Sequence, residues 1–492
     1  MRWLLYVRLK PSKNLEIMRS VFVVVLFAIL LLSCRQKEEA PNILFIFADD
    51  QCFNTIRELG NLEVYTPTLD ELARQGTVFT TCYNMGGWHG AVCVASRTML
   101  NTGRFLWRAE AVDNRPDLDS LAEAGHLWSR EMEKLGYDTY MTGKWHVNIN
   151  PPEIFTHAGT VRGGMPGAVP EMYDRPLDEN DWEWTPWDTA FGGFWEGGVH
   201  WSEVVANETI GFLDSASASE NPFFMYIAFN APHDPRQSPK EYVDMYPLEN
   251  VGLPDNFLAE YPYKDSIGCS AALRDEMLAP FPRTEYAVKV HRQEYYAIIS
   301  HLDAQIGRIL THLEETGQAG NTLIFFTADH GLALGQHGLM GKQNMYDHSM
   351  RPPLLLAGPG IPEGRREKMA VYLQDLMPTA IDFAGGKVPE WVEFNSLKGI
   401  IEGTQTVSSY SEIYGAYMDL QRMIRVDDYK MIVYPRAGVI KLFDLINDPS
   451  EKYNLAGASS QKERILQMFG RLQEVQAAMG DTLDLSDYRF DL

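Results

Sequence analysis

Residues 41–50 read PNILFIFADD, an apolar run from Ile43 to Ala48 that ends in two aspartates. A continuous apolar run of this length is typical of a strand buried on both faces of a sheet. Amphipathic stretches such as Gln293 to Glu315 separate it from three comparable runs, which are Tyr137 to Thr142, Phe223 to Phe229 and Thr322 to Thr327. This alternation predicts an α/β fold in which a large, mostly parallel sheet is sandwiched by helices.

The sequence changes in character after about residue 385. Short runs with a period of two are separated by turn residues and lead to a helical stretch from Lys462 to Met479. The runs are Met423 to Val426, Lys430 to Tyr434 and Ile440 to Phe443. This pattern predicts a smaller C-terminal antiparallel sheet plus a helix. We therefore expect an N-terminal catalytic domain over residues 35–385 and a C-terminal subdomain over residues 386–492.

The charge balance limits the classes of partner. The 492 residues include 43 basic and 66 acidic side chains, which gives a net charge of -23. Such a balance disfavours a general attraction to nucleic acid, so no nucleic-acid partner is expected. An anionic substrate would need a local basic pocket.

The N-terminus predicts export. Met18 and a following arginine precede an apolar run from Val21 to Leu32 that is short for a membrane span and suits a signal peptide. Residues 31–34 resemble a bacterial lipobox, which implies cleavage before Cys34 and a lipid anchor on its thiol. Residues 1–34 are thus predicted to be a lipoprotein signal peptide with its true start at Met18. The mature protein would lie in the bacterial cell envelope, in the periplasm or at the outer-membrane surface. A short anchor helix or an ordinary signal peptide is the alternative.

A short segment that contains charged residues or histidine follows each of the four long apolar runs. The segments are Asp49 and Asp50; Gly143, Lys144, Trp145 and His146; Ala231, Pro232 and His233; and Asp329, His330 and Gly331. Ligands of open α/β sheets bind beyond the carboxyl ends of the strands. Carboxylates gathered there repel one another unless a cation neutralises them, and oxygen ligands favour calcium or magnesium. Each motif alone has a simpler explanation, such as a helix cap or a loop histidine.

A family resemblance rests on residues 93–104. Cys93-Val94-Ala95-Ser96-Arg97 followed by Thr102-Gly103-Arg104 resembles the signature of the formylglycine-dependent type I sulfatases, which have the alkaline phosphatase-like fold. Further blocks resemble that family in the correct order, and they are residues 41–50, 143–146, 232–235, 328–331, 341–346 and 442–455. The similarity covers essentially the whole mature chain. Two positions depart from the family pattern, because Ala95 replaces the commoner proline and His330 replaces asparagine.

The resemblance implies an enzyme that hydrolyses sulfate esters. A sulfatase-maturating enzyme would oxidise Cys93 to formylglycine, and a calcium ion would be bound. A hydrated aldehyde offers two hydroxyls on one carbon, so that one attacks sulfur and the other expels sulfate. The implied metal ligands are Asp49, Asp50, the modified Cys93, Asp329 and His330.

The resemblance also implies roles for the cationic side chains and the histidines. Arg97 and Lys144 would hold the hydrate, and Lys144 would also touch sulfate. His146 would act as the base, while His233 and Lys342 would bind sulfate and one of them would protonate the departing alcohol. The stretch from 94 to 100 is predicted to be helical, which places a helix N-terminus beneath the anion.

The substrate is predicted only by class. The family and the expected compartment favour a sulfated saccharide. Five tryptophans between residues 182 and 201 suit sugar rings or simply pack a long loop, and they are Trp182, Trp184, Trp187, Trp195 and Trp201. His89 and Trp88 precede the signature, and we assign His89 to substrate binding.

Two other functions remain open. A phosphodiesterase or phosphonate hydrolase of the same superfamily could use the same aldehyde. A non-catalytic, sugar-binding lipoprotein would keep the fold and lack the modification of Cys93. The remaining cysteines, Cys52, Cys82 and Cys269, allow at most one disulfide.

Overall fold

The predicted sheet is present and places the four long apolar runs side by side. The computed structural model describes residues 40–490, and its compact unit begins at Pro41. An eight-stranded sheet has the order β10-β2-β9-β8-β1-β7-β5-β6. Its four central strands are parallel, and they are β8 (Thr322–Ala328), β1 (Asn42–Ala48), β7 (Phe223–Ala228) and β5 (Asp138–Lys144). The predicted signal peptide and Cys34 lie outside the described residues.

The outer strands make the sheet mixed at one edge. β6 (His157–Arg162) pairs in parallel with β5, whereas β9 (Leu354–Ala357) runs antiparallel to β8. β2 (Thr77–Phe79) and β10 (Arg365–Glu367) complete that edge. A separate pair consists of β3 (Cys82–Tyr83) and β11 (Val371–Tyr372).

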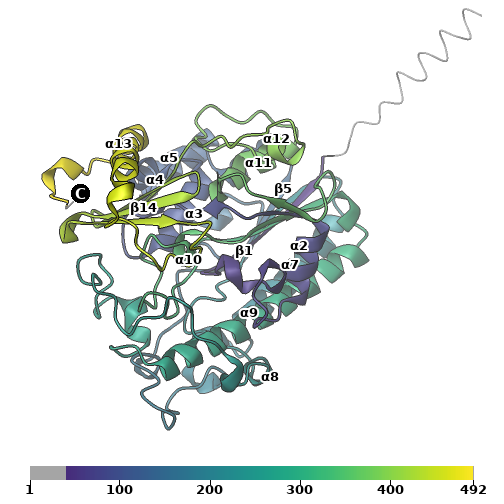
Figure 1. Cartoon of the computed structure of the whole chain (residues 1–492). Coiled ribbons are helices and arrows are strands. Elements are labelled where there is room, and N and C mark those ends of the chain that lie inside the picture. Colours follow the sequence, from purple (N-terminus) through teal and green to yellow (C-terminus); the bar gives the residue numbers. More distant parts are fainter. Residues whose placement is uncertain (1–39, 491–492) are drawn as a thin grey trace, which may run out of the picture. The chain divides into compact units, whose positions relative to one another are not determined.

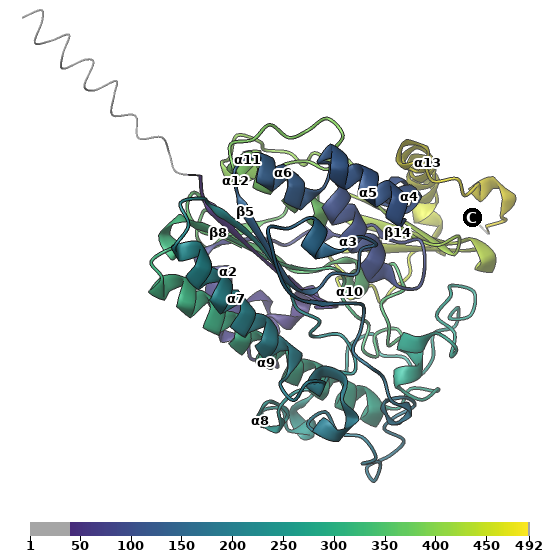
Figure 2. The same ribbon diagram turned by 180° about the vertical axis from the view of Figure 1, so that it is seen from behind.

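Helices cover both faces of the sheet, as Figure 2 shows. α2 (Pro67–Gln75), α7 (Trp201–Ser217) and α9 (Glu285–Glu315) lie on one face, where Leu44 and Ile46 of β1 share a buried core with α7 and α9. The other face carries α3 (Val92–Thr102), α4 (Leu106–Val112), α5 (Arg115–Ala124), α6 (Trp128–Lys134) and α11 (Leu376–Phe383). Phe45 points to that second face, and its ring lies 5.1 Å from the ring of Trp128. β1 is therefore buried on both sides, as its unbroken apolar run requires.

The long helix α9 begins eight residues before the predicted start at Gln293. The side chain of Thr284 accepts a hydrogen bond from the backbone N–H of Ala287 and so caps the helix. His291 is buried on this segment, and this polar residue interrupts the apolar spacing that predicts a helix.

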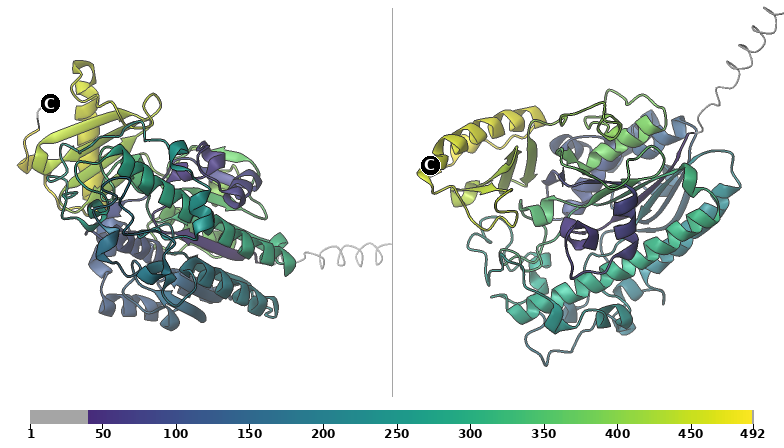
Figure 3. Two further views of the ribbon diagram at one scale, coloured as in Figure 1. Left: turned by 90° about the horizontal axis from the view of Figure 1, so that it is seen from below. Right: turned by 45° about the vertical axis from the view of Figure 1, so that its right-hand side comes forward.

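A second, five-stranded sheet forms the C-terminal part of the described chain (Figure 3). Its antiparallel strands are β12 (Ile413–Tyr417), β13 (Gln421–Val426), β14 (Tyr429–Tyr434) and β15 (Val439–Asp444), and α13 (Lys462–Met479) contacts β13. This confirms the predicted small sheet plus helix. The proposed domain boundary at residue 385 stays a prediction.

Two strands of the small sheet, β12 and β4 (Gly86–Gly87), were not among the predicted runs. β4 lies just before the cysteine motif and pairs in parallel with β12. Gly86 has a φ of +92°, and a Cβ added there would lie 2.0 Å from the backbone oxygen of Ala416. Only glycine fits that approach. The described chain also contains the short helices α8 (Lys240–Asp244), α10 (Asp347–Met350) and α12 (Lys398–Ile401).

The described cysteines carry no disulfide. Cys52, Cys82, Cys93 and Cys269 are all free and buried. Among the helices of residues 40–490, none combines the length and the apolar character that crossing a membrane requires. Figure 1 shows the described chain, with β1, β5 and β14 and many of the helices labelled.

Candidate active site

The carboxyl ends of the four central strands meet at one buried cluster. Asp49 and Asp50 follow β1, Lys144 is the last residue of β5, His233 follows β7, and Asp329 follows β8. All five side chains are buried. Asp50 has a φ of +70°, in the left-handed region that non-glycine residues seldom adopt outside turns and functional sites. The topology of the sheet therefore brings together residues that are far apart in the sequence.

Cys93 lies in the first turn of α3 and points into this cluster. Its Sγ is 3.4 Å from Asp49 Oδ1, 3.7 Å from Asp50 Oδ1 and 3.0 Å from Lys342 Nζ. Burial and the charge of Asp329 raise the pKa of the Cys93 thiol well above its usual value. The unmodified thiol is therefore protonated at neutral pH and is a poor nucleophile.

Arg97 lies one helical turn after Cys93 and forms hydrogen bonds with the cluster. Its Nε is 3.0 Å from Asp329 Oδ2, and its Nη1 donates to the backbone oxygen of Lys144 at 2.8 Å. Its Nη2 lies 3.9 Å from Asp49 Oδ1 and has no hydrogen-bond partner among the described residues. The site thus contains one buried cationic N–H group that is free to meet a further acceptor.

The two lysines predicted for the site each meet one aspartate. Lys144 Nζ pairs with Asp49, and Lys342 Nζ lies 2.5 Å from Asp50 Oδ2. Burial lowers the pKa of Lys342, but Asp50 and Cys93 outweigh it and raise that pKa well above its usual value. Burial raises the pKa of both Asp49 and Asp50 to about 6, with Asp329 contributing in the same direction. Both lysines are placed where negative charge from an anionic substrate would also be stabilised.

The donor set fits a hard divalent cation. One ligand atom each from Asp49, Asp50, Cys93 and His233 lies within 4.8 Å of the others. Two of these four ligand atoms are carboxylate oxygens, and the carboxylate of Asp329 lies beside Asp50. Buried carboxylates gathered in this way favour calcium or magnesium over softer metals. His233 is an addition to the predicted ligands.

Two predicted ligands lie outside that group of four. Asp329 accepts from the backbone N–H of Asp50 at 3.0 Å and from Arg97. His330 places its Nε2 3.2 Å from the backbone oxygen of Val92 and 3.3 Å from Asn84 Nδ2, while its Nδ1 is buried without a partner among residues 40–490. The roles of Asp329 and His330 as metal ligands stay predictions.

His233 and His146 lie at the edge of the cluster. His233 Nε2 is 3.5 Å from Asp50 Oδ2. His146 follows Lys144 closely and has a φ of +59°. Burial, together with the charges of Lys144 and Arg97, lowers the pKa of His146 to about 3. Its imidazole is therefore neutral at pH 7 and is able to accept a proton.

His89 does not join the buried cluster. It lies half-buried on the loop before α3, where its Nδ1 accepts from the backbone N–H of Ala91 at 3.1 Å. Its ring packs edge-on against Trp88 at 5.8 Å. Its assignment to substrate binding stays a prediction.

Several residues that shape the site were not predicted from the sequence. Asp234 lies in a motif that was recognised for its histidine, yet its carboxylate is 3.1 Å from His233 Nδ1 and also pairs with Arg274. The adjacent His-Asp pair was the available signal. Asn84 donates to the backbone oxygen of Asp329, and Gly164 leaves room for the ring of His146. These contacts join distant segments, and the sequence offered no signal for them.

Comparisons with known proteins agree with this arrangement. The family model described as Sulfatase matches residues 41–386, and that for the C-terminal region of N-sulphoglucosamine sulphohydrolase matches residues 335–478. An arylsulfatase of Clostridium perfringens is 30% identical over 470 residues, which cover 86% of this chain and 92% of that protein. An N-acetylglucosamine-6-O-sulfatase of Bacteroides thetaiotaomicron is 25% identical over 94% of this chain and 91% of that protein.

Solved structures share the fold. A protein in complex with its substrate D-glucosamine-2-N,6-O-disulfate has a TM-score of 0.68 at 22% identity, covering 90% of this chain and 99% of that one. A phosphonate monoester hydrolase from Silicibacter pomeroyi has a TM-score of 0.70 at 22% identity, covering 90% and 96%. With the family match over most of its length, the chain belongs to the sulfatase family, whose members are sulfuric ester hydrolases.

Proposed function

We propose that this sulfatase removes sulfate from saccharides and uses a formylglycine made from Cys93 together with a bound calcium ion. The placement of Cys93 carries the proposal, because its Sγ lies within 3.7 Å of Asp49, Asp50 and Lys342 at the convergence of the strand ends. The raised pKa of its thiol supports conversion to a different nucleophile. A hydrated aldehyde supplies two hydroxyls on one carbon, one to attack sulfur and one to expel sulfate.

A divalent cation would be held by Asp49, Asp50 and residue 93, with Asp329 and His330 as the further ligands that the family pattern suggests. When bound, it would lower the pKa of a ligated hydroxyl and polarise the sulfate group. The carboxylates of Asp49 and Asp50 in the grouped donor set support calcium.

The chain's own side chains supply the remaining functions. Arg97 would orient the side chain of residue 93 from the same helix, through the N–H that lacks a partner among the described residues. Lys144, Lys342 and His233 would surround the sulfate and stabilise its charge. His146 is neutral and would take a proton, whereas His233 or Lys342 would give one to the departing alcohol.

The saccharide assignment rests on relatives. One is an N-acetylglucosamine-6-O-sulfatase, and one structural neighbour has a sulfated glucosamine as its substrate. The proposed cellular context includes a maturating enzyme that oxidises Cys93 and a lipid anchor at Cys34 in the bacterial cell envelope. A lipoprotein lipase should release ethanol-soluble lipid from the native protein if the anchor is present. No lipid should be released after Cys34→Ala.

Two measurements test the proposal. Mass spectrometry of the peptide that contains residue 93, from protein made with a maturating enzyme, is expected to show the aldehyde in place of the thiol. The same preparation should hydrolyse para-nitrophenyl sulfate faster than bis-para-nitrophenyl phosphate or a phosphonate monoester. A dominant phosphorus-ester rate would favour the function of the phosphonate hydrolase neighbour. An unmodified, inactive protein from the native host would favour a sugar-binding lipoprotein.

A further inference from the structure

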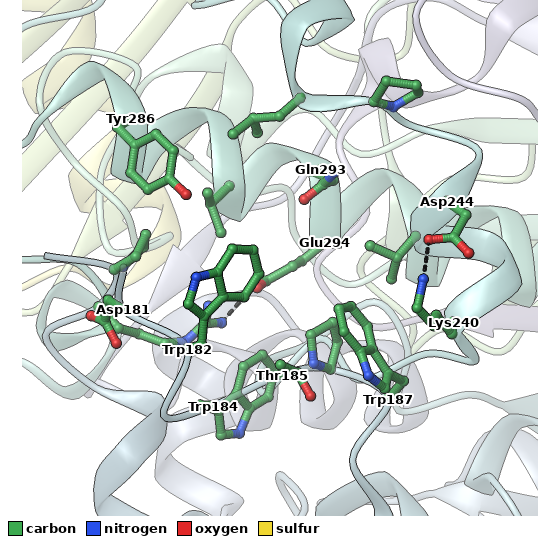
Figure 4. Close-up of a pocket in the computed structure, with 17 residues that line it drawn as sticks. Asp181, Trp182, Trp184, Thr185, Trp187, Lys240, Asp244, Tyr286, Gln293 and Glu294 are labelled. Atoms are coloured by element: carbon green, nitrogen blue, oxygen red, sulfur yellow. Dashed lines mark hydrogen bonds and ion pairs between the residues drawn. The ribbon is translucent and has the colours of Figure 1, made fainter. Parts of the chain in front are cut away.

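A pocket of about 570 Å³ lies apart from the cysteine cluster, between the loop at residues 175–187, α8 and the first turns of α9 (Figure 4). We call it the tryptophan pocket, because its lining includes Trp182, Trp184 and Trp187. None of the residues that line it in the described chain belongs to the predicted catalytic or metal set. Its volume lies within the range of small-molecule sites.

The pocket presents aromatic surface that folding alone does not require. Trp182 is 66% exposed, although it lines a cavity. Trp184 is buried, and the guanidinium of Arg175 covers its ring at 3.9 Å. Trp187 is half-buried, with Lys240 Nζ 5.2 Å from its ring centre. Exposed aromatic surface inside a pocket is typical of a ligand-binding surface.

Both cations of the pocket are paired with carboxylates. Arg175 forms two parallel hydrogen bonds with Glu294, at 2.6 and 2.5 Å, and Lys240 pairs with Asp244 at 2.6 Å. An anionic group would therefore find both cations already engaged. Asp181 is the third lining carboxylate, and it accepts from the backbone N–H of Leu177 at 2.7 Å. A cationic ligand would meet Arg175 and Lys240 beside two of the rings, which disfavours its stacking there and leaves a neutral ligand as the better match.

Hydrogen-bonding groups accompany the rings. Gln293 donates through Nε2 to the backbone oxygen of Tyr246 at 2.6 Å, and its Oε1 receives no hydrogen bond from the described residues. The hydroxyls of Tyr286 and Thr185 also lack partners in the described chain. Figure 4 shows Gln293 and Tyr286 on the side of the pocket opposite Trp184 and Trp187. Apolar ring faces combined with free polar groups match a sugar ring, which has apolar C–H faces and a rim of hydroxyls.

We propose that the tryptophan pocket binds a neutral pyranose unit of a saccharide. This inference rests on the proposed function, because it gives the pocket an unsulfated unit of the substrate chain. His291 links the two sites, since its Nε2 is 2.8 Å from the backbone oxygen of Arg175 and its Nδ1 is 3.0 Å from Arg236, three residues after His233. Holding a polymer at a second point raises its effective concentration at the catalytic cluster.

Titration calorimetry tests the pocket directly with four neutral probes, which are cellohexaose, xylohexaose, mannohexaose and chitohexaose. At least one is expected to bind the full-length protein. Trp182→Ala should weaken that binding by about tenfold or more, which is 1.4 kcal/mol, and Trp182→Phe should retain most of it. Tyr453→Ala is the matched control, because Tyr453 is 64% exposed and does not line the pocket. Binding of none of the four probes overturns the proposal, as does binding that Trp182→Ala leaves unchanged.

Choline and inorganic sulfate provide the contrasting arms of the calorimetry. Choline or sulfate binding that Trp182→Ala abolishes would overturn the neutral-ligand assignment. A kinetic measurement separates this proposal from the proposed function. Trp182→Ala should raise KM for a sulfated polysaccharide that the enzyme desulfates, whereas the control Tyr453→Ala should leave that KM unchanged. Loss of aryl sulfate activity in the wild type would refute the proposed function, whereas calorimetry decides the pocket in either case.

Discussion

Asp234 Oδ1 lies 3.1 Å from His233 Nδ1, and the backbone oxygen of Asp234 lies 2.9 Å from the same nitrogen. Two acceptors at one ring nitrogen keep the hydrogen on Nδ1, so that Nε2 faces Asp50. Burial raises the pKa of Asp234, but Arg274 and His233 outweigh it and hold that pKa well below its usual value. A carboxylate thus orients a histidine of the site, as is common for histidines near metals.

Removing that carboxylate should impair the reaction without unfolding the protein. We expect Asp234→Asn to lower kcat for para-nitrophenyl sulfate by about tenfold to a hundredfold, because the carboxylate orients the ring of His233. Asp265→Asn, at an exposed aspartate that pairs with Lys264, serves as control. An unchanged rate would show that Asp234 has no part in positioning His233.

Gly164 gives the ring of His146 its space. A Cβ at this position would lie 3.0 Å from Cε1 and 3.1 Å from Nε2 of His146. We expect Gly164→Ala to displace the ring and to lower kcat by about tenfold to a hundredfold, with little change in stability. The neighbouring Gly163 has nothing within 4 Å of an added Cβ, so Gly163→Ala should keep full activity. Equal rates for the two variants would contradict a catalytic role for His146.

Removal of divalent cations should affect activity and stability together. Chelation with EGTA is expected to abolish sulfate ester hydrolysis and to lower Tm, and added calcium should restore both. At a hundred times its Kd, a bound ion stabilises the folded state by about 3 kcal/mol. Asp50→Asn should lose the calcium-dependent rise in Tm, because Asp50 is one of the grouped ligands. Full activity after exhaustive chelation would rule out a catalytic metal.

The buried carboxyl of Asp303 should make the free energy of unfolding depend on pH. It lies on α9 and accepts from the first backbone N–H groups of α2, those of Thr68 at 3.0 Å and Leu69 at 2.8 Å. Burial raises its pKa from 3.8 to about 6. The folded state therefore holds this proton more tightly than the unfolded state, so its contribution to stability is greatest below pH 4 and declines as the pH rises to about 6.

Urea denaturation between pH 4 and 7 measures this term. The difference in unfolding free energy between wild type and Asp303→Asn should fall by roughly 2 kcal/mol across that range, because the pKa of Asp303 rises from 3.8 in the unfolded chain to about 6 in the folded state. Asp303→Asn removes the titration and keeps one acceptor for the helix. A pH-independent difference would mean that the carboxyl is not perturbed by burial.

The four central strands and their terminal residues could be predicted because each strand is buried on both faces. Such strands need unbroken apolar sequence, so their ends are visible as the first polar residue, as at Asp49 and Asp329. α13 was predicted with its observed bounds, because its apolar spacing is regular. The cysteine motif was found through a resemblance, and physical patterning alone did not locate it.

Contacts between distant segments could not be predicted. β4 has only two residues, both glycines, and its pairing with β12 leaves no periodic signal. The links from Asp234 to Arg274 and from Asn84 to Asp329 depend on how loops cross at the ends of the sheet. The position of His330 against Val92 depends in the same way on the start of α3. Local sequence predicts many of the helices and strands, but the contacts between loops depend on how the whole chain packs.

The pairing of β4 with β12 yields a further expected outcome. Gly86→Ala would place a Cβ 2.0 Å from the backbone oxygen of Ala416, and we expect it to lower the unfolding free energy by about 3 kcal/mol or more and to reduce activity. Gly136 has nearly the same φ, +89°, with nothing within 4 Å. Gly136→Ala should therefore cost only the backbone strain, about 1 kcal/mol. Denaturant unfolding of both variants checks this, and equal losses would mean that the contact with Ala416 is unimportant.

This pairing also sets an order of events during synthesis. The loop that leads into Cys93 gains its partner strand only when residues 413–417 have left the ribosome, late in the chain. Until then β4 lacks its partner strand, and in the finished fold Cys93 is 2% exposed. The maturating enzyme proposed for this thiol would therefore have to reach it before the chain has folded.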